Sequence, residues 1–449
     1  MRTVLLVVIL LALLLATVAE PLAPAVELDV AGATVGRGTT ITARATDRGR
    51  GLAAFELRLV PSTGTPVVLE RKIFPQRSWL GSGVGKAELS VSLQDATLDE
   101  GPATLEAWAR DHSWLALVRG GTTVSQPVTL DLTPPRLDVL TDRQTTRVGS
   151  TASVVYRTDP ETRRDGVQVG LLFFPGTAGY FADPALRVAL YTISPTDPEG
   201  IPTLIAADEA GNERTLRIDV EVRERPFRER TLDLNDDFLE RKIPPLLEEA
   251  GLRSADDLVQ DYLLVNRDLR ERTELRLREI CRESMPRLHW DGAFLPLPNA
   301  APLALFGDRR AYRHGGQIID HQMHLGYDLA SLRGAPVPAA NTGRVVHTGP
   351  LGIYGQTVVL DHGLGLFTVY GHLRAIDVTV GAVVTRAQEI GKTGETGLAG
   401  GDHLHFSTAI HGVHVDPVEW WDGRWIRDHV MARLDGHATA SAPAPAPAS

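Results

Sequence analysis

The fold of the C-terminal third is decided by the stretch Gly365-Leu-Phe-Thr-Val-Tyr-Gly-His372. Its apolar and β-branched residues between glycines are typical of a short strand. Similar runs occur at Gly343-Arg-Val-Val-His347, Thr357-Val-Val-Leu-Asp361 and His403-Leu-His-Phe-Ser407, separated by glycine-rich turns. We therefore predict a compact all-β domain over residues 288–433.

Histidines are concentrated in this predicted domain. Ten of the fourteen lie between His314 and His414, and three groups stand out: His324-Leu-Gly-Tyr-Asp328, Tyr370-Gly-His372 and His403-Leu-His405. A catalytic zinc ion takes three protein ligands from histidine and carboxylate side chains. The first group and one histidine of the third would supply that number.

The spacing within these groups suggests how the remaining histidines act. Residues i and i+2 of a strand share a face, so His403 and His405 project together, and one can bind metal while the other transfers protons. His372 ends a strand-like segment and offers a second unligated imidazole. At Gly326 a side chain would obstruct a tight turn between His324 and Asp328.

Together the groups resemble the lysostaphin-type (LytM-type) zinc metallopeptidase family. The family motifs His-x-Gly-x-Asp, a histidine after a strand, and His-x-His-Phe occur here as His324–Asp328, His372 and His403–Phe406. The resemblance covers about 110 residues, 317–425. The sequence departs from the family at Ala399-Gly-Gly-Asp402, where Asp402 is expected to alter the rim of the substrate groove.

This resemblance implies a duplicated hybrid motif fold and a site for Zn²⁺. It implies that the zinc ligands are His324, Asp328 and His405, and that His372 and His403 form the unligated catalytic pair. His403 would be the general base, and His372 would hold the oxyanion or orient the water.

Two further β modules precede this domain. Alternating Val-, Thr- and Leu-rich segments interrupted by turn residues predict immunoglobulin-like β-sandwiches over residues 26–133 and 134–225. The pair Pro134-Pro135 marks their boundary, because proline can continue neither strand nor helix. Binding to the cell wall or to a partner is an alternative main role for these modules.

A helical connector is predicted over residues 226–287. Leu258, Tyr262, Val265 and Leu269 follow helical spacing, with Ser254 and Asp257 as a capping pair. The single cysteine, Cys281, lacks a catalytic context, so we interpret it as a partly buried helix residue. The Ala- and Pro-rich tail at 434–449 is predicted to be disordered.

The N-terminus predicts export. Residues 1–25 begin with Met1-Arg2 and an apolar run from Thr3 to Ala19, which suits either a cleaved signal peptide or an inner-membrane anchor through residues 3–19. The protein is expected in the periplasm or cell envelope. Its net charge of -10, without a cluster of basic residues, argues against nucleic acid as a partner.

These expectations combine into one functional prediction. The chain is a mainly β, zinc-dependent endopeptidase that hydrolyses peptide bonds of peptidoglycan. The alternative is a non-catalytic LytM-like envelope protein that activates other cell-wall hydrolases, and an envelope protein is a candidate regulator of either. The chain preceding the enzyme is long enough to cover its cleft until a partner displaces it.

Overall fold

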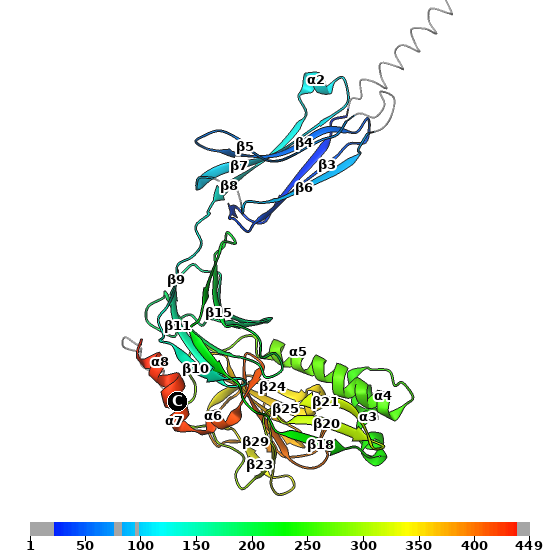
Figure 1. Cartoon of the computed structure of the whole chain (residues 1–449), viewed down its shortest axis with the longest axis vertical. Helices are drawn as coiled ribbons and strands as arrows, with labels where there is room; N and C mark the ends of the chain where they lie inside the picture. The colour runs from blue at the N-terminus through cyan, green and yellow to red at the C-terminus, as the bar shows by residue number, and fades with distance from the viewer. Residues whose placement is uncertain (1–21, 76–82, 95–97, 438–449) are drawn as a thin grey trace, which may run out of the picture. The chain divides into compact units, whose positions relative to one another are not determined.

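The computed structural model describes residues 22–75, 83–94 and 98–437 (Figure 1). Residues 1–21 of the predicted export segment and residues 438–449 of the predicted tail lie outside these ranges. The prediction that the tail is disordered from residue 434 is wrong at its start, because Leu434 is fully buried in the last helix. No helix within the described residues is long and apolar enough to cross a membrane. The chain divides into two compact units: residues up to 135 with 161–163 and 207–214 form the first, and the rest form the second.

In the first unit, two mainly antiparallel sheets enclose one apolar core. The sheets have strand orders β1-β3-β6 and β2-β8-β7-β4-β5. Alternation places every second residue of β7 inside, as the sequence pattern predicts. The elements are β1 Ala25–Val30, β2 Thr34–Val35, β3 Thr40–Thr46, β4 Leu52–Pro61, β5 Val67–Ile73, β6 Lys86–Ser92, β7 Gly101–Asp111, α2 Ala116–Arg119 and β8 Thr122–Leu130.

The predicted second module is also built from strands. They form sheets in the orders β10-β17, β14-β11-β9 and β13-β12-β15-β16. The assignment of either module to the immunoglobulin-like class stays a prediction. The strands are β9 Leu137–Val139, β10 Gln144–Arg147, β11 Thr151–Thr158, β12 Arg164–Val169, β13 Leu172–Pro175, β14 Leu186–Thr192, β15 Thr203–Ala207, β16 Glu213–Arg217 and β17 Val220–Arg223.

Most of this β segment belongs to the same compact unit as the C-terminal domain. The indole N–H of Trp420 donates to Thr151 Oγ1 at 3.2 Å, and the Asp416 amide donates to the Gly149 carbonyl at 2.9 Å. The C-terminal helices that make these contacts are α6 Pro417–Trp421, α7 Gly423–Ile426, the π-helix η3 Arg427–Met431 and α8 Ala432–Asp435.

The C-terminal domain is organised around one large sheet. Its order is β19-β22-β30-β26-β25-β24-β28, with β31 paired to β30, and two three-stranded sheets have the orders β18-β20-β21 and β23-β29-β27. The elements are β19 Ala301–Ala304, β20 Arg309–His314, β21 Gln317–Met323, β22 Tyr327–Ala330, β23 Pro336–Pro338, β24 Gly343–Pro350, the 3₁₀ helix η2 Gly352–Tyr354, β25 Gln356–Gly363, β26 Leu366–Gly371, β27 Ala375–Ile376, β28 Val383–Val384, β29 Glu389–Lys392, β30 Leu404–Ile410 and β31 Val413–Val415.

Both faces of this sheet are covered. Every residue of β30 is buried, including the polar residues His405, Ser407 and Thr408. Along β25 the side chains alternate: Val358 and Leu360 join one apolar cluster, while Val359 joins another. The second cluster includes helix residues such as Leu239 and Tyr262.

Those helix residues belong to the segment between β17 and β19, which lies along the sheet in Figure 1. Asp257 caps α4, because its carboxylate accepts from the Gln260 amide at 2.8 Å. Ser254, which we paired with it, donates to Asp261 instead. The elements are β18 Glu229–Asp233, α3 Asp236–Ala250, α4 Leu258–Leu263, the π-helix η1 Leu264–Leu269 and α5 Arg270–Ile280.

The contact between the β segment and α6 predicts a pH dependence of stability. Burial raises the pKa of Glu419 from 4.5 to about 7. The folded state therefore holds this proton more tightly, and its stabilisation is complete below pH 4.5 and lost as the pH rises through about 7. The free energy of unfolding should therefore fall by about 3 kcal/mol over this pH range, and Glu419→Gln should abolish this fall.

Denaturant unfolding between pH 4.5 and 8 measures this difference. Glu199→Gln changes an exposed carboxylate of the same unit and serves as the control. Parallel pH profiles for Glu419→Gln and the unsubstituted protein would contradict the account.

Candidate metal centre

Three adjacent strands bring the predicted site residues together. Asp328 on β22 lies opposite His405 on β30 in the antiparallel register. On the other side of β30, His405 pairs with Gly371, the last residue of β26, and His372 follows directly. His324 lies in the turn that leads into β22. Histidine and carboxylate side chains that are distant in the sequence thus meet at one place on the sheet.

The three predicted ligands converge closely. Asp328 Oδ1 is 3.0 Å from His324 Nε2 and 2.9 Å from His405 Nδ1, and the two nitrogens are 3.2 Å apart. Ligand atoms around a tetrahedral zinc ion stand about 3.3 Å apart, given bonds of about 2.0–2.1 Å. The spacing is slightly smaller than this, and the residues fit a single metal ion.

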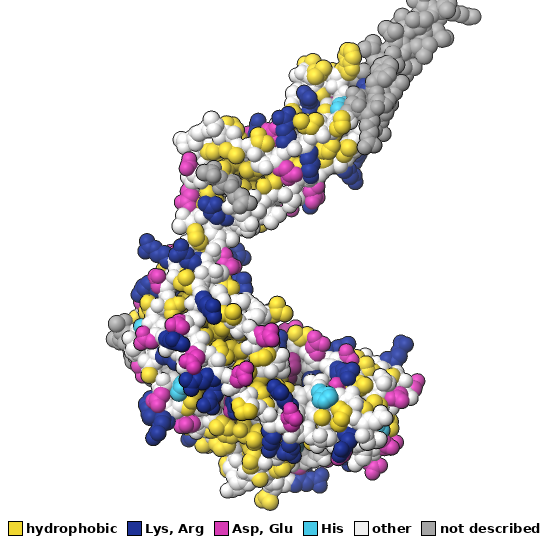
Figure 2. All heavy atoms as spheres, viewed as in Figure 1, with side chains coloured by type: hydrophobic (Ala, Val, Ile, Leu, Met, Phe, Trp, Pro, Cys, Tyr) yellow, Lys and Arg dark blue, Asp and Glu magenta, His cyan; other side chains and the backbone are white. Residues whose placement is uncertain are grey.

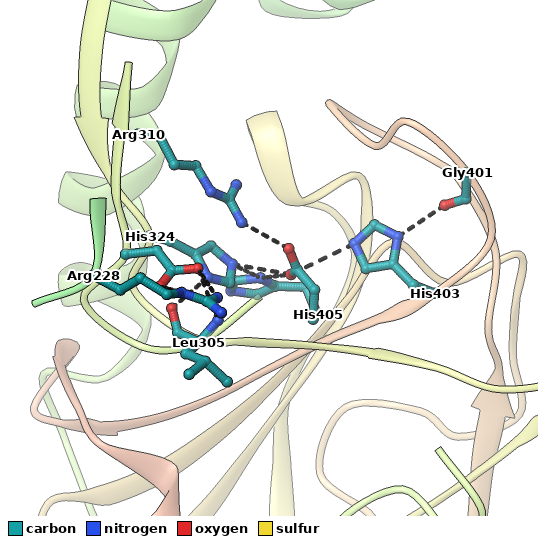
Figure 3. A network of polar contacts seen from close by, with 9 residues as sticks. Arg228, Leu305, Arg310, His324, Gly401, His403 and His405 are labelled. Atoms are coloured by element: carbon teal, nitrogen blue, oxygen red, sulfur yellow. Dashed lines mark hydrogen bonds and ion pairs between the residues drawn. The ribbon is translucent and has the colours of Figure 1, made fainter. Parts of the chain in front are cut away.

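Other groups fix the orientation of these ligands. His324 Nδ1 lies 3.0 Å from the Leu305 carbonyl, which can only accept a hydrogen bond, so Nδ1 carries the proton and Nε2 faces the centre. Arg310 donates to Asp328 Oδ2 at 2.9 Å. Figure 3 shows Arg310 and His403 on opposite sides of the carboxylate.

A second ion pair supports the turn that carries His324. Arg228 donates twice to Asp308, at 2.8 and 2.6 Å. The His324 amide donates to the Asp308 carbonyl at 2.9 Å, and the Gly307 amide donates to the His324 carbonyl at 2.7 Å. Arg228, which immediately precedes β18, therefore holds the backbone of His324 in place through Asp308.

Gly326 is required for space. A Cβ atom at this position would lie 2.6 Å from Cε1 and Nε2 of His405, well inside contact distance. Its φ is outside the left-handed region that favours glycine. Glycine was expected here because of a tight turn, whereas in the structure it is required by the His405 ring and by the Phe406 carbonyl, which a Cβ atom would approach to 2.8 Å.

The two predicted catalytic histidines lie beside the ligands. His372 Nδ1 is 2.8 Å from the Thr396 carbonyl, and His403 Nδ1 is 2.8 Å from the Gly401 carbonyl. Because carbonyl oxygens only accept, each neutral ring carries its proton on Nδ1 and leaves Nε2 free as an acceptor. The rings are 4.8 Å apart between centroids, and His403 Nε2 is 3.5 Å from Asp328 Oδ1.

The environment of these two rings differs. Burial, followed by the charges of His403 and His405, lowers the pKa of His372 well below its usual value. Burial also lowers the pKa of His403, but the hydrogen bond from the protonated ring to Asp328, the charge of that carboxylate and the Gly401 carbonyl together outweigh this effect and raise the pKa. His372 also has a φ of 62°, a strained conformation for a residue with a side chain.

A further group of polar residues, which sequence reasoning missed, lies behind His405. The Tyr354 ring stacks on the His405 ring at 4.9 Å. Its hydroxyl donates to Glu274 on α5 at 2.7 Å, and His414 Nε2 lies 3.0 Å from the same carboxylate. Burial raises the pKa of Glu274, but the charge and hydrogen bond of His414, the Tyr354 hydroxyl and the charge of Arg270 together outweigh burial and lower the pKa to about 2.

The centre opens into a cleft of about 530 Å³. Residues of the predicted connector form part of its wall, including Asn235, Asp237 and Phe238 at the start of α3. The Lys242 ammonium donates to the Glu395 carbonyl, which ties α3 to the loop after β29. The remaining lining residues are Leu232, Asp233, Leu234, Arg241, Tyr262, Arg270, Arg310, Tyr312, His324, Asp328, Ile353, Tyr354, His372, Leu398, Ala399, Gly400, His403 and His405.

Two other sequence features have structural positions. Asp402 accepts from Thr393 Oγ1 at 2.6 Å and from the Gly334 amide at 3.1 Å, so it joins two loops beside the cleft. Cys281 is fully buried, and burial raises the pKa of its thiol. A buried neutral thiol is a poor nucleophile, in agreement with its interpretation as a structural residue.

Comparison with known proteins identifies the domain. Residues 322–417 match the model of Peptidase family M23, so the C-terminal part of the chain carries an M23 (LytM-type) domain. This match confirms the resemblance stated above.

Curated relatives match about a quarter of the chain. The DD-carboxypeptidase/endopeptidase Mpg of Neisseria meningitidis is 38% identical over 107 residues, 24% of this chain and 25% of that protein. Peptidoglycan DD-endopeptidase ShyA of Vibrio cholerae is 38% identical over 96 residues, 21% and 22% of the two chains. Murein hydrolase activator EnvC of Escherichia coli is 32% identical over 109 residues, 24% and 26%. The chain thus spans about a quarter of the length of these relatives.

The contact at Gly326 generates a prediction about metal affinity. Gly326→Ala should weaken zinc binding by about 10- to 100-fold, because the added methyl group displaces the His405 ring although every ligand is retained. Competition with a chromophoric chelator measures the affinity. Gly400→Ala is the matched control, since its added Cβ meets nothing within 4 Å. Equal affinities for the two variants would contradict this explanation of Gly326.

Proposed function

We propose that this protein is a zinc-dependent endopeptidase that hydrolyses peptide bonds of peptidoglycan. The proposal rests on one observation above all: three ligand atoms stand within 3.2 Å of one another, and two unligated imidazoles lie beside them. Similarity to a protein named as a peptidoglycan DD-endopeptidase supports the substrate class.

Each residue has a distinct role in the proposed reaction. His324, Asp328 and His405 would hold the zinc ion, which when bound would supply Lewis acidity toward a peptide carbonyl and a water molecule. His403 accepts the proton of the attacking water at Nε2. His372, whose Nε2 also faces outward as an acceptor, orients that water. Arg310 keeps the Asp328 carboxylate in place for the metal.

The cleft wall suggests where the substrate is contacted. We propose that the connector belongs to the substrate-binding surface, because Asn235 and Asp237 face the cleft beside the metal centre. The same wall would limit the width of a bound peptide chain. We further propose that the protein acts in the periplasm or cell envelope, on the basis of its apolar N-terminal run from Thr3 to Ala19.

The second candidate function is activation of other wall hydrolases without catalysis. One relative is named as a murein hydrolase activator, which favours this alternative. Against it, all five predicted site residues are retained and lie together. An activator needs no bound metal, so zinc content separates the two proposals: about one equivalent supports the enzyme, and none supports the activator.

Catalysis should depend on the two kinds of histidine in different ways. His405→Ala removes a ligand and should abolish both zinc binding and release of muropeptide fragments. His403→Ala should keep zinc while lowering kcat by about 10²- to 10⁴-fold, because only proton transfer is lost. Mass spectrometry of digested muropeptides, with metal analysis of each variant, measures both effects.

His321→Ala is the control, since this exposed histidine lies on β21 of the same unit. A chelator should stop the reaction, and added zinc should restore it. Unchanged hydrolysis by His405→Ala would exclude the proposed mechanism. Stimulation of another hydrolase that persists in His405→Ala, without intrinsic hydrolysis, would favour the activator.

A further inference from the structure

The connection between β7 and β8 exposes large apolar side chains at one end of the first unit. Trp114, Leu117 and Val118 are 70%, 75% and 86% exposed, and Leu115 is 39% exposed. Figure 2 shows hydrophobic side chains projecting at the end of this unit that carries α2. We call these four residues the apolar tip. Contiguous exposed apolar side chains on a folded domain are typical of an interaction site.

Hydrogen bonds hold the apolar tip in this arrangement. Asp111 accepts from the Ser113 amide at 2.8 Å, and the Ser113 hydroxyl accepts from the Ala116 amide at 3.1 Å. Trp108 donates to the Gly120 carbonyl at 2.7 Å and so fixes the return of the chain. Ala116 alone points inward, and it is buried. The hydrogen-bonded turn therefore keeps the neighbouring side chains exposed.

The apolar tip lies at the same end of the unit as the entry of the chain. Ala25, the first residue of β1, pairs with Thr46, and Leu52 at the start of β4 pairs with Asp111 at the end of β7. A short turn connects Thr46 to Leu52, so β1 begins beside the β7–β8 connection. Only residues 20–24 separate β1 from the apolar run Thr3 to Ala19, a reach of about 17 Å when extended.

Cationic side chains outnumber anionic ones around the apolar tip. Arg48, Lys86 and Arg119 are the exposed charged residues among the described residues of the connections 46–52, 83–86 and 111–120. The acidic residues there, Asp47 and Asp111, are buried: Asp47 accepts from the Gly51 amide, whereas Asp111 accepts from the Ser113 amide and forms an ion pair with Arg119 at 3.2 Å, so Arg48 and Lys86 carry the cationic border. A tryptophan-containing apolar cluster bordered by cations matches the interface of a membrane with anionic headgroups.

We propose that the apolar tip inserts into the lipid bilayer that also receives the N-terminal run, and that it orients the first unit at the membrane surface. The occupant is the acyl and headgroup region of an anionic bilayer. The adjacent apolar run and the cationic border favour lipid over a protein partner, since both place a membrane at this end of the unit.

The test uses the full-length protein in vesicles of phosphatidylethanolamine and phosphatidylglycerol. Cys281 is fully buried, so an environment-sensitive fluorophore can be attached selectively at Leu117→Cys. Brominated acyl chains should quench this probe and its emission should shift to the blue. Thr63→Cys is the matched control, because it is exposed in the turn at the opposite end of β4 and should be unaffected.

Adding Trp114→Ser and Val118→Ser to the labelled protein should reduce the quenching, since both side chains are exposed and their loss leaves the core intact. A probe at Leu117→Cys that stays unquenched in pure lipid would overturn the proposal and leave the apolar tip to a protein partner. Equal quenching at Thr63→Cys would overturn it as well, because association would then be unspecific.

Discussion

The site depends on the register between β22 and β30. This pairing sets Asp328 directly opposite His405, and the turn before β22 then carries His324 to the same point. A slip of one residue would turn the side chains of β22 to the other face and separate the carboxylate from both imidazoles. Burial of β30 on both faces makes such a slip costly, because its apolar residues would lose their packing. The core therefore specifies the geometry of the metal centre.

Much of this centre was predictable from local sequence. The spacing of His324 and Asp328, and of His403 and His405, indicates metal-binding and proton-transferring residues within a few positions of each other. The residues behind the ligands were beyond such reasoning. Glu274 and His414 are 140 positions apart, and each looks ordinary in its own segment. Arg310 lies on another strand from its partner Asp328, with no local motif to connect them.

The prediction of secondary structure was likewise correct for some segments and incomplete for others. Short apolar and β-branched runs between glycines predicted the buried strands of the C-terminal sheet correctly. In the connector, the helical prediction rested on residues after Leu246, whereas α3 begins at Asp236 and contains Pro244 and Pro245. Prolines disfavour a helix interior, but Leu239 and Ile243 pack against the sheet and tertiary burial outweighs this preference. The residues that line the cleft from α3 were for that reason missed.

Burial of the sheet on both faces also affects how the domain folds in the absence of a metal ion. Small metal-dependent domains fold only when the metal replaces a missing core. Here β25, β26 and β30 are buried along their whole lengths except for Gln356. The scaffold can therefore fold first and bind a metal ion afterwards, so that metal availability, independently of synthesis, can set how much of the protein has an occupied centre.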